Sequence, residues 1–132
     1  MSGDDLPDED HVSRHCSRTR CVNGVVQGSA FLRRAGEPAL SVAWLEFTKQ
    51  PTQVEQLRTV VQELRCRRQI PNDSYMAVLN VGAAIERVRE GTTPAVQLTA
   101  IHAPTSGIPS HAQLQGMEVN SLVVAELLAE VA

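Results

Sequence analysis

The architecture of this chain is first indicated by HVSRHCSRTRCVNGVV, residues 11–26. Within it, Asn23 and Gly24 stand between two pairs of apolar residues. Asn-Gly tolerates the positive φ angles of a type I′ turn, the turn that most often joins two antiparallel strands. We therefore predict a β-hairpin over residues 11–34, with residues 11–16 in an extended conformation.

The middle of the chain predicts a strand followed by a helix. Residues 40–47 (LSVAWLEF) fit either a strand that places Leu40, Val42 and Trp44 on one face or a strand that runs into a helical turn. Residues 53–68 predict a helix, because a capping box at TQVE precedes five apolar residues at helical spacing.

The last third predicts two strands, two helices and a long loop. Residues 75–81 predict a strand buried on both faces, and residues 83–91 predict a short helix. Residues 95–101 predict another strand, and the Pro-rich residues 102–112 (HAPTSGIPSHA) predict a loop. Residues 119–132 predict a helix capped by Asn120 or Ser121.

This order of elements predicts an α+β fold. We expect a single-layer mixed or antiparallel sheet that starts with the N-terminal β-hairpin and packs against two or three helices. Five of the fifteen acidic residues lie within residues 1–10, where little can be buried, so we expect a disordered acidic tail there. Residues 11–132 are expected to form a single domain.

Composition limits the classes of partner. Beyond residue 10, twelve basic residues face ten acidic ones, a balance that makes nucleic acid a weak candidate partner. Apolar runs are too short for a membrane span, so we expect no membrane contact. Three cysteines without a CxxC pair or a secretory leader predict a cytoplasmic protein with reduced thiols.

A metal site is the first chemistry to weigh, and its candidate ligands are His11, His15, Cys16 and Cys21. In an extended strand His11 and His15 share a face but lie about 13 Å apart, and Cys16 points to the opposite face. The spacing therefore makes zinc the weakest reading of this stretch, and we expect no cofactor.

Arginine and histidine side chains suggest a site for phosphate, because arginine suits bidentate contact with phosphate and histidine exchanges protons near neutral pH. One hypothesis is a nucleotide- or phosphate-directed enzyme, a transferase or a nuclease-like toxin. Its candidate catalytic residues are His11, Arg14, Glu46 and His111, which would line one pocket. The ligand-binding candidates are Arg14, Arg18, Arg20, Ser41, Trp44, His102 and Ser110.

The C-terminal helix carries the preferred hypothesis. Its only charges are Glu126 and Glu130, so its surface is apolar nearly all round. Such a helix is either buried in its own domain or covered by a partner. We therefore expect a non-enzymatic binding or accessory component of a protein complex, which meets a protein partner or a second copy of itself through residues 120–131.

Four motifs give a resemblance: DHVSRH (10–15), GSAFLR (28–33), LSVAWLE (40–46) and PSHA (109–112). Together they resemble an uncharacterised group of small bacterial proteins with the pattern DHVxRY…SAFxLR…LSVxWLE…PSHA, for which no activity is known. By position the resemblance points to His11, Arg14, Ser41, Trp44, Glu46, Ser110 and His111. His15 stands where the pattern has Tyr, and the pattern includes none of the cysteines, which further weakens the metal site.

Overall fold

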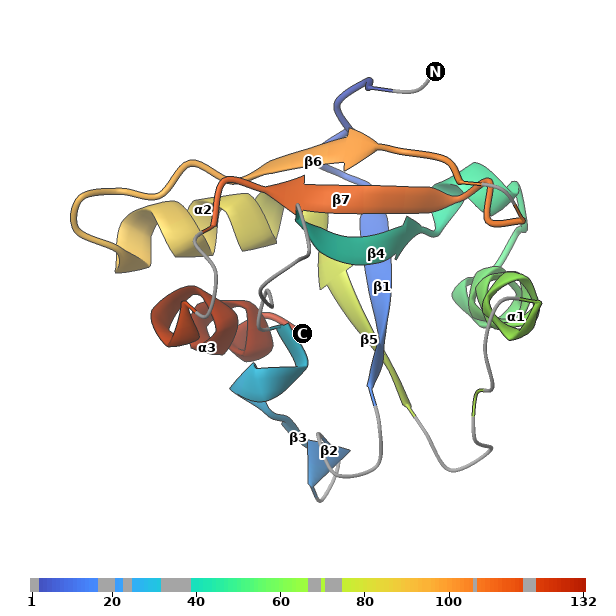
Figure 1. The fold of residues 1–132 in the computed structure, drawn as a ribbon, viewed down its shortest axis with the longest axis horizontal. Coiled ribbons are helices and arrows are strands. Elements are labelled where there is room, and N and C mark those ends of the chain that lie inside the picture. Colours follow the sequence, from blue (N-terminus) through green and yellow to red (C-terminus); the bar gives the residue numbers. More distant parts are fainter. Residues whose placement is uncertain are drawn as a thin grey trace.

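The computed structural model describes residues 3–16, 21–22, 25–31, 39–66, 70, 75–105, 107–117 and 121–132. Figure 1 shows the arrangement of the elements. In chain order they are β1 (His11–Cys16), β2 (Cys21–Val22), β3 (Val25–Val26), η2 (Gly28–Phe31), β4 (Leu40–Trp44), η3 (Glu46–Thr48), α1 (Gln53–Arg65), β5 (Tyr75–Asn80), α2 (Val81–Gly91), β6 (Thr99–His102), β7 (His111–Gln115) and α3 (Leu122–Glu130).

The main sheet has five strands in the order β5-β1-β4-β7-β6, and every neighbouring pair is antiparallel. A separate two-stranded sheet joins β2 to β3. These sheets and the three α-helices confirm the predicted α+β fold and its N-terminal hairpin.

The hairpin is shorter than predicted. Within residues 11–34, β1 pairs with β4 and β5 instead of with a hairpin partner, and residues 28–31 form a 3-10 helix. The reason is burial: Val12 and Cys16 lie in the core, which requires strands on both sides of β1. The predicted turn at residues 23–24 lies outside the described residues.

Helices cover both faces of the sheet. On one face α2, α3 and η2 enclose the larger core, which includes Val12, Leu79 and Leu114. On the other face α1 packs over a smaller cluster of Ala43, Leu45 and Val60. Figure 1 shows α1 on one side of the β1–β5 pair and α2 and α3 on the other.

The helices begin where side chains cap them. Thr52 accepts a hydrogen bond from the Glu55 N–H, which confirms the predicted start of α1. Ser121, one of the two predicted caps, accepts from the Val124 N–H at the start of α3. Asn120 and residues 67–68 of the predicted first helix lie outside the described residues.

Strand β7 corrects the predicted boundary of the loop over residues 102–112. The loop ends at His111, because HAQLQ has the alternation of a strand with one buried face. Ala112 and Leu114 enter the core, while His111, Gln113 and Gln115 point to the opposite face. The signal was present in the sequence but was too short to stand out beside the two prolines.

Residues 3–6, in the segment expected to be an acidic tail, lie beside β6. The Gly3 N–H donates to the His102 carbonyl and the Leu6 N–H to the Ala100 carbonyl, so residues 3–6 extend the sheet beside β6. Leu6 is 5% exposed because it enters the larger core.

Within the described ranges, no helix is both long and apolar enough to cross a membrane.

Candidate functional site

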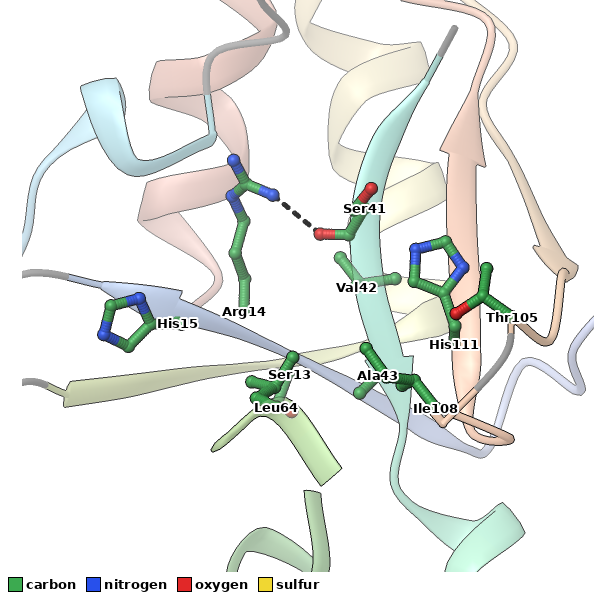
Figure 2. Close-up of a pocket in the computed structure, with 10 residues that line it drawn as sticks. All are labelled: Ser13, Arg14, His15, Ser41, Val42, Ala43, Leu64, Thr105, Ile108 and His111. Carbon is green, nitrogen blue, oxygen red and sulfur yellow. Dashed lines mark hydrogen bonds between the residues drawn. The ribbon is translucent and has the colours of Figure 1, made fainter. Parts of the chain in front are cut away.

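A pocket of about 400 Å³ opens where β1 and β4 separate. The two strands pair only at Val12↔Trp44 and Ser13↔Ala43, although β4 continues along β7 as far as Leu40. Figure 2 shows the two strands diverging, with the lining side chains around the gap. The lining residues are Ser13, Arg14, His15, Ser41, Val42, Ala43, Leu64, Thr105, Ile108 and His111.

Arg14 bridges the gap between the diverging strands. Its Nε donates to the Ala30 carbonyl at 2.6 Å, and its Nη1 donates to the Ser41 carbonyl at 2.7 Å. Figure 2 draws the second of these bonds. The guanidinium therefore replaces the strand donor that the Ser41 carbonyl lacks, and it places a permanent positive charge in the pocket wall.

The base of the pocket is one register row of the sheet. Ser13 pairs with Ala43, and Ala43 pairs with His111 on its other side. Paired residues point to the same face of a sheet, so the three side chains stand in line on the face that α1 partly covers. Ala43 is the smallest of the three, and its methyl group leaves space between Ser13 and His111.

Ser13 is buried without satisfying its hydroxyl. The residue is 2% exposed, and its Oγ has no hydrogen-bond partner among the described residues. Buried hydroxyl groups are nearly always hydrogen-bonded, because they otherwise lose the bonds that water supplies. The Ser13 hydroxyl therefore lacks the hydrogen bond that a buried hydroxyl usually makes.

His111 has one ring nitrogen committed. Its Nδ1 lies 2.7 Å from the Ala103 carbonyl, which can only accept, so Nδ1 carries the hydrogen. In the neutral ring, Nε2 is then an acceptor. Within the described part of the chain, no hydrogen bond to Nε2 is found.

Thr105 and Ile108, from the loop before β7, form one wall of the pocket. They exchange two backbone hydrogen bonds of 3.2 and 3.0 Å. Ser110, 1% exposed, donates to the Glu63 carboxylate of α1 through both its hydroxyl and its N–H. These two hydrogen bonds attach the loop to α1 through Ser110.

His102 and Trp44 stabilise the same loop and do not line the pocket. The His102 Nε2 donates to the Pro109 carbonyl at 2.9 Å, and its ring packs edge-on against Trp44 with centroids 5.2 Å apart. The Trp44 Nε1 donates to Asp10. Both residues were predicted to bind ligand, but their contacts are internal to the protein.

His11 and Glu46 form a pair outside the pocket lining. The Glu46 carboxylate accepts from the His11 main-chain N–H at 2.8 Å and lies 2.7 Å from the His11 Nδ1. The enzyme hypothesis required these two residues to line one pocket with Arg14 and His111. The structure instead pairs His11 with Glu46, and only Arg14 and His111 of the four line the pocket.

The predicted site residues therefore divide into three sets. Arg14, Ser41 and His111 line the pocket, whereas His11, Trp44, Glu46, His102 and Ser110 do not. Arg18, Arg20 and the side chain of Cys21 lie outside what the structure describes. Sequence reasoning missed Ser13, Ala43 and Thr105, because a serine or an alanine in a strand carries no signal until its neighbours across the sheet are known.

The cysteine–histidine stretch has the geometry of an ordinary strand. Residues 11–16 are extended, as predicted, and Cys16 is 1% exposed in the larger core, on the face opposite His11 and His15. Over the described ranges, no three His, Cys, Asp or Glu side chains gather in a way that would hold a metal ion.

The pocket has a clear electrostatic character. Its titratable lining residues are Arg14, His15 and His111, and none of its described lining residues carries a carboxylate. Val42, Ala43, Leu64 and Ile108 supply apolar surface. Comparison with known proteins adds no constraint: no protein-family model matches the chain, and no curated protein or solved structure is significantly similar to it.

Proposed function

We propose that this protein binds a small organic anion in the pocket between β1 and β4. The observation that carries the proposal is the lining, which combines one arginine and two histidines with no carboxylate among its described residues. A guanidinium beside neutral hydrogen-bonding groups favours a carboxylate or phosphate ligand.

The apolar lining residues define the rest of the ligand. Leu64 of α1, Val42 of β4 and Ile108 of the loop all line the pocket, so an aliphatic group is favoured next to the charge. A volume of about 400 Å³ is near the lower end for small-molecule sites. The proposed ligand is therefore a compact acid with a short aliphatic body.

The lining favours binding of such an acid over nucleotide chemistry. No Phe, Tyr or Trp is among the described lining residues, so a base would have only imidazole rings and the Arg14 guanidinium to stack on. The His11–Glu46 pair, the predicted acid–base machinery, lies outside the lining. We therefore propose a binding protein in preference to a phosphate-directed enzyme.

The test is a titration of ¹⁵N-labelled protein with 4-methylpentanoate, with 4-methylpentanamide as the uncharged control. The acid is expected to shift the amide resonances of residues 13–15 and 41–43 and those of Thr105, Ile108 and His111, and the uncharged amide is not. Equal effects of both compounds, or shifts confined to other residues, would refute an anion site here.

A43V provides a matched variant, because a larger side chain at the base of the pocket occupies the space for the ligand. Q113V adds the same side chain to the same face of the sheet, on a residue that does not line the pocket. Binding is expected to fall in A43V and to persist in Q113V, with both folds checked by circular dichroism. Binding unchanged in a folded A43V would place the ligand elsewhere.

A second candidate function is self-association through the start of α3. Leu122 and Val123 are 55% and 58% exposed, whereas Val124, Ala125, Leu127 and Leu128 are buried in the chain's own core. The intramolecular burial removes most of the apolar surface on which a partner helix would pack. Sedimentation velocity of wild type and of an L122S/V123S variant tests it, and a wild-type monomer at all micromolar concentrations would reject it.

A further inference from the structure

We infer that the ligand is a 2-hydroxy acid: a carboxylate whose neighbouring carbon bears a hydroxyl group and a short aliphatic chain. The inference rests on the proposed function and specifies its ligand class. It is carried by Ser13 and His111, the polar side chains at the two ends of the row that Ala43 separates.

The Ser13 hydroxyl offers the ligand a donor. Ser13 lines the pocket, and its Oγ is buried with no partner within the described part of the chain. A carboxylate oxygen accepts hydrogen bonds only, so it matches this donor. Figure 2 shows Ser13 beside Leu64, whereas Arg14 extends from β1 toward Ser41.

The His111 imidazole offers the ligand a hydrogen-bond acceptor. Because Nδ1 gives its hydrogen to the Ala103 carbonyl, the neutral ring presents Nε2 as an acceptor. An ionised carboxylate has no hydrogen to give, but a hydroxyl group does. A simple carboxylate can therefore accept from Ser13 only, whereas a 2-hydroxy acid can also donate to His111.

The spacing of the row fits two adjacent functional groups. Two strand intervals separate Ser13 from His111, which corresponds to about 10 Å between their Cα atoms. The serine and histidine side chains extend from the two ends, so the space above Ala43 suits a carboxylate and its neighbouring carbon. The aliphatic chain then has Leu64 and Ile108 as apolar neighbours.

The experiment compares 2-hydroxy-4-methylpentanoate, as both enantiomers, with 4-methylpentanoate in calorimetric titrations of the full chain. The better enantiomer is expected to bind about tenfold more tightly than the plain acid, because it adds one hydrogen bond to a buried acceptor. Equal affinities would overturn the inference and leave the anion site standing. Binding of neither acid would overturn the proposed function itself.

His111→Asn tests the acceptor. The Asn amide can still donate to the Ala103 carbonyl, but it has no atom at the position of Nε2. The preference for the hydroxy acid is expected to fall to about onefold, while affinity for the plain acid stays within a factor of about two. A preference that survives in H111N would overturn the role of His111, and a retained melting temperature excludes a folding defect.

Ser13→Ala tests the donor, and Thr99→Ala is its control on an exposed β6 residue outside the pocket lining. S13A is expected to weaken both acids by a similar factor of about ten, since both present a carboxylate, and T99A to weaken neither. Unchanged binding in S13A would overturn the assignment of the carboxylate to Ser13. If inorganic phosphate bound more tightly than either acid, the inferred ligand group would be a phosphate and the 2-hydroxy acid would be overturned.

Discussion

Ser13 of β1 and His111 of β7 stand on the same face of the sheet in one register row, with Ala43 of β4 as the residue between them. The row exists because β4 pairs with both neighbours at Ala43 and then parts from β1. A pocket built in this way needs no cavity in the core: it needs one small residue between two larger ones.

Ser13→Ala is expected to leave the free protein equally stable or to stabilise it by up to about 1 kcal/mol, because the substitution removes a buried hydroxyl that has no partner among the described residues. Urea denaturation in ligand-free buffer measures the change. A loss of more than about 1 kcal/mol would show that Ser13 makes a structural hydrogen bond, and it would weaken the ligand-binding role.

Arg14→Lys is expected to lower the free energy of unfolding by about 1–3 kcal/mol, because one ammonium group cannot reproduce two bonds of fixed geometry to the Ala30 and Ser41 carbonyls. Arg87→Lys is the control, since Arg87 pairs with Glu130 at the surface and exposed pairs contribute about 0–1 kcal/mol. Equal effects in the two variants would contradict the bridging role of Arg14.

Glu46→Gln separates the anion pocket from the enzyme hypothesis. The change weakens the contact with His11, both side chains being about one-third exposed, and is expected to cost no more than about 1 kcal/mol of stability. Affinity for 4-methylpentanoate should stay within a factor of about two. A large loss of affinity in folded E46Q protein would return Glu46 to the binding site.

Glu63→Ala is expected to loosen the pocket wall, because it removes the acceptor for the Ser110 hydroxyl and N–H. Hydrogen exchange of the Ile108, Ser110 and His111 amides should become faster, while β5 amides, in the strand beside β1, keep their protection. Faster exchange spread evenly over the sheet would indicate general destabilisation in place of a local anchor.

Gly116→Ala is expected to destabilise the fold by about 2 kcal/mol or more. Gly116 has a φ of +106°, and a Cβ placed there would lie 2.4 Å from the Gln97 carbonyl oxygen. The matched variant Gly3→Ala also has a positive φ, but its Cβ would meet nothing within 4 Å. Thermal unfolding should therefore show a smaller loss for G3A, and similar losses would mean that strain alone decides.

The fold followed from patterns that are local in the chain. The Thr52 cap, the alternation of Leu40, Val42 and Trp44, and the apolar spacing of α1 each involve residues within a few positions of one another. β7 was missed because its alternation spans only five residues and follows a Pro-rich stretch. The partners of β1 were missed because pairing between distant strands leaves no local signature.

Much less of the candidate site than of the fold could be predicted from the sequence. Arg14 and His111 were noticed for their chemistry, but the residues expected beside them, His11 and Glu46, contact each other instead. Ser13 could be identified only from the strand register, which places it in the same row as His111, two strands away. Its buried hydroxyl has no hydrogen-bond partner among the described residues. A site that depends on which strands part is set by tertiary structure.

The segment over residues 3–6, paired along β6, also affects association between molecules through the edge of the sheet. An uncovered strand invites another chain to extend the sheet, which is a common route to aggregation. Here the outermost backbone carries the exposed carboxylates of Asp4 and Asp5. Like charges on two approaching molecules repel, so the acidic segment opposes pairing of two molecules at this edge of the sheet.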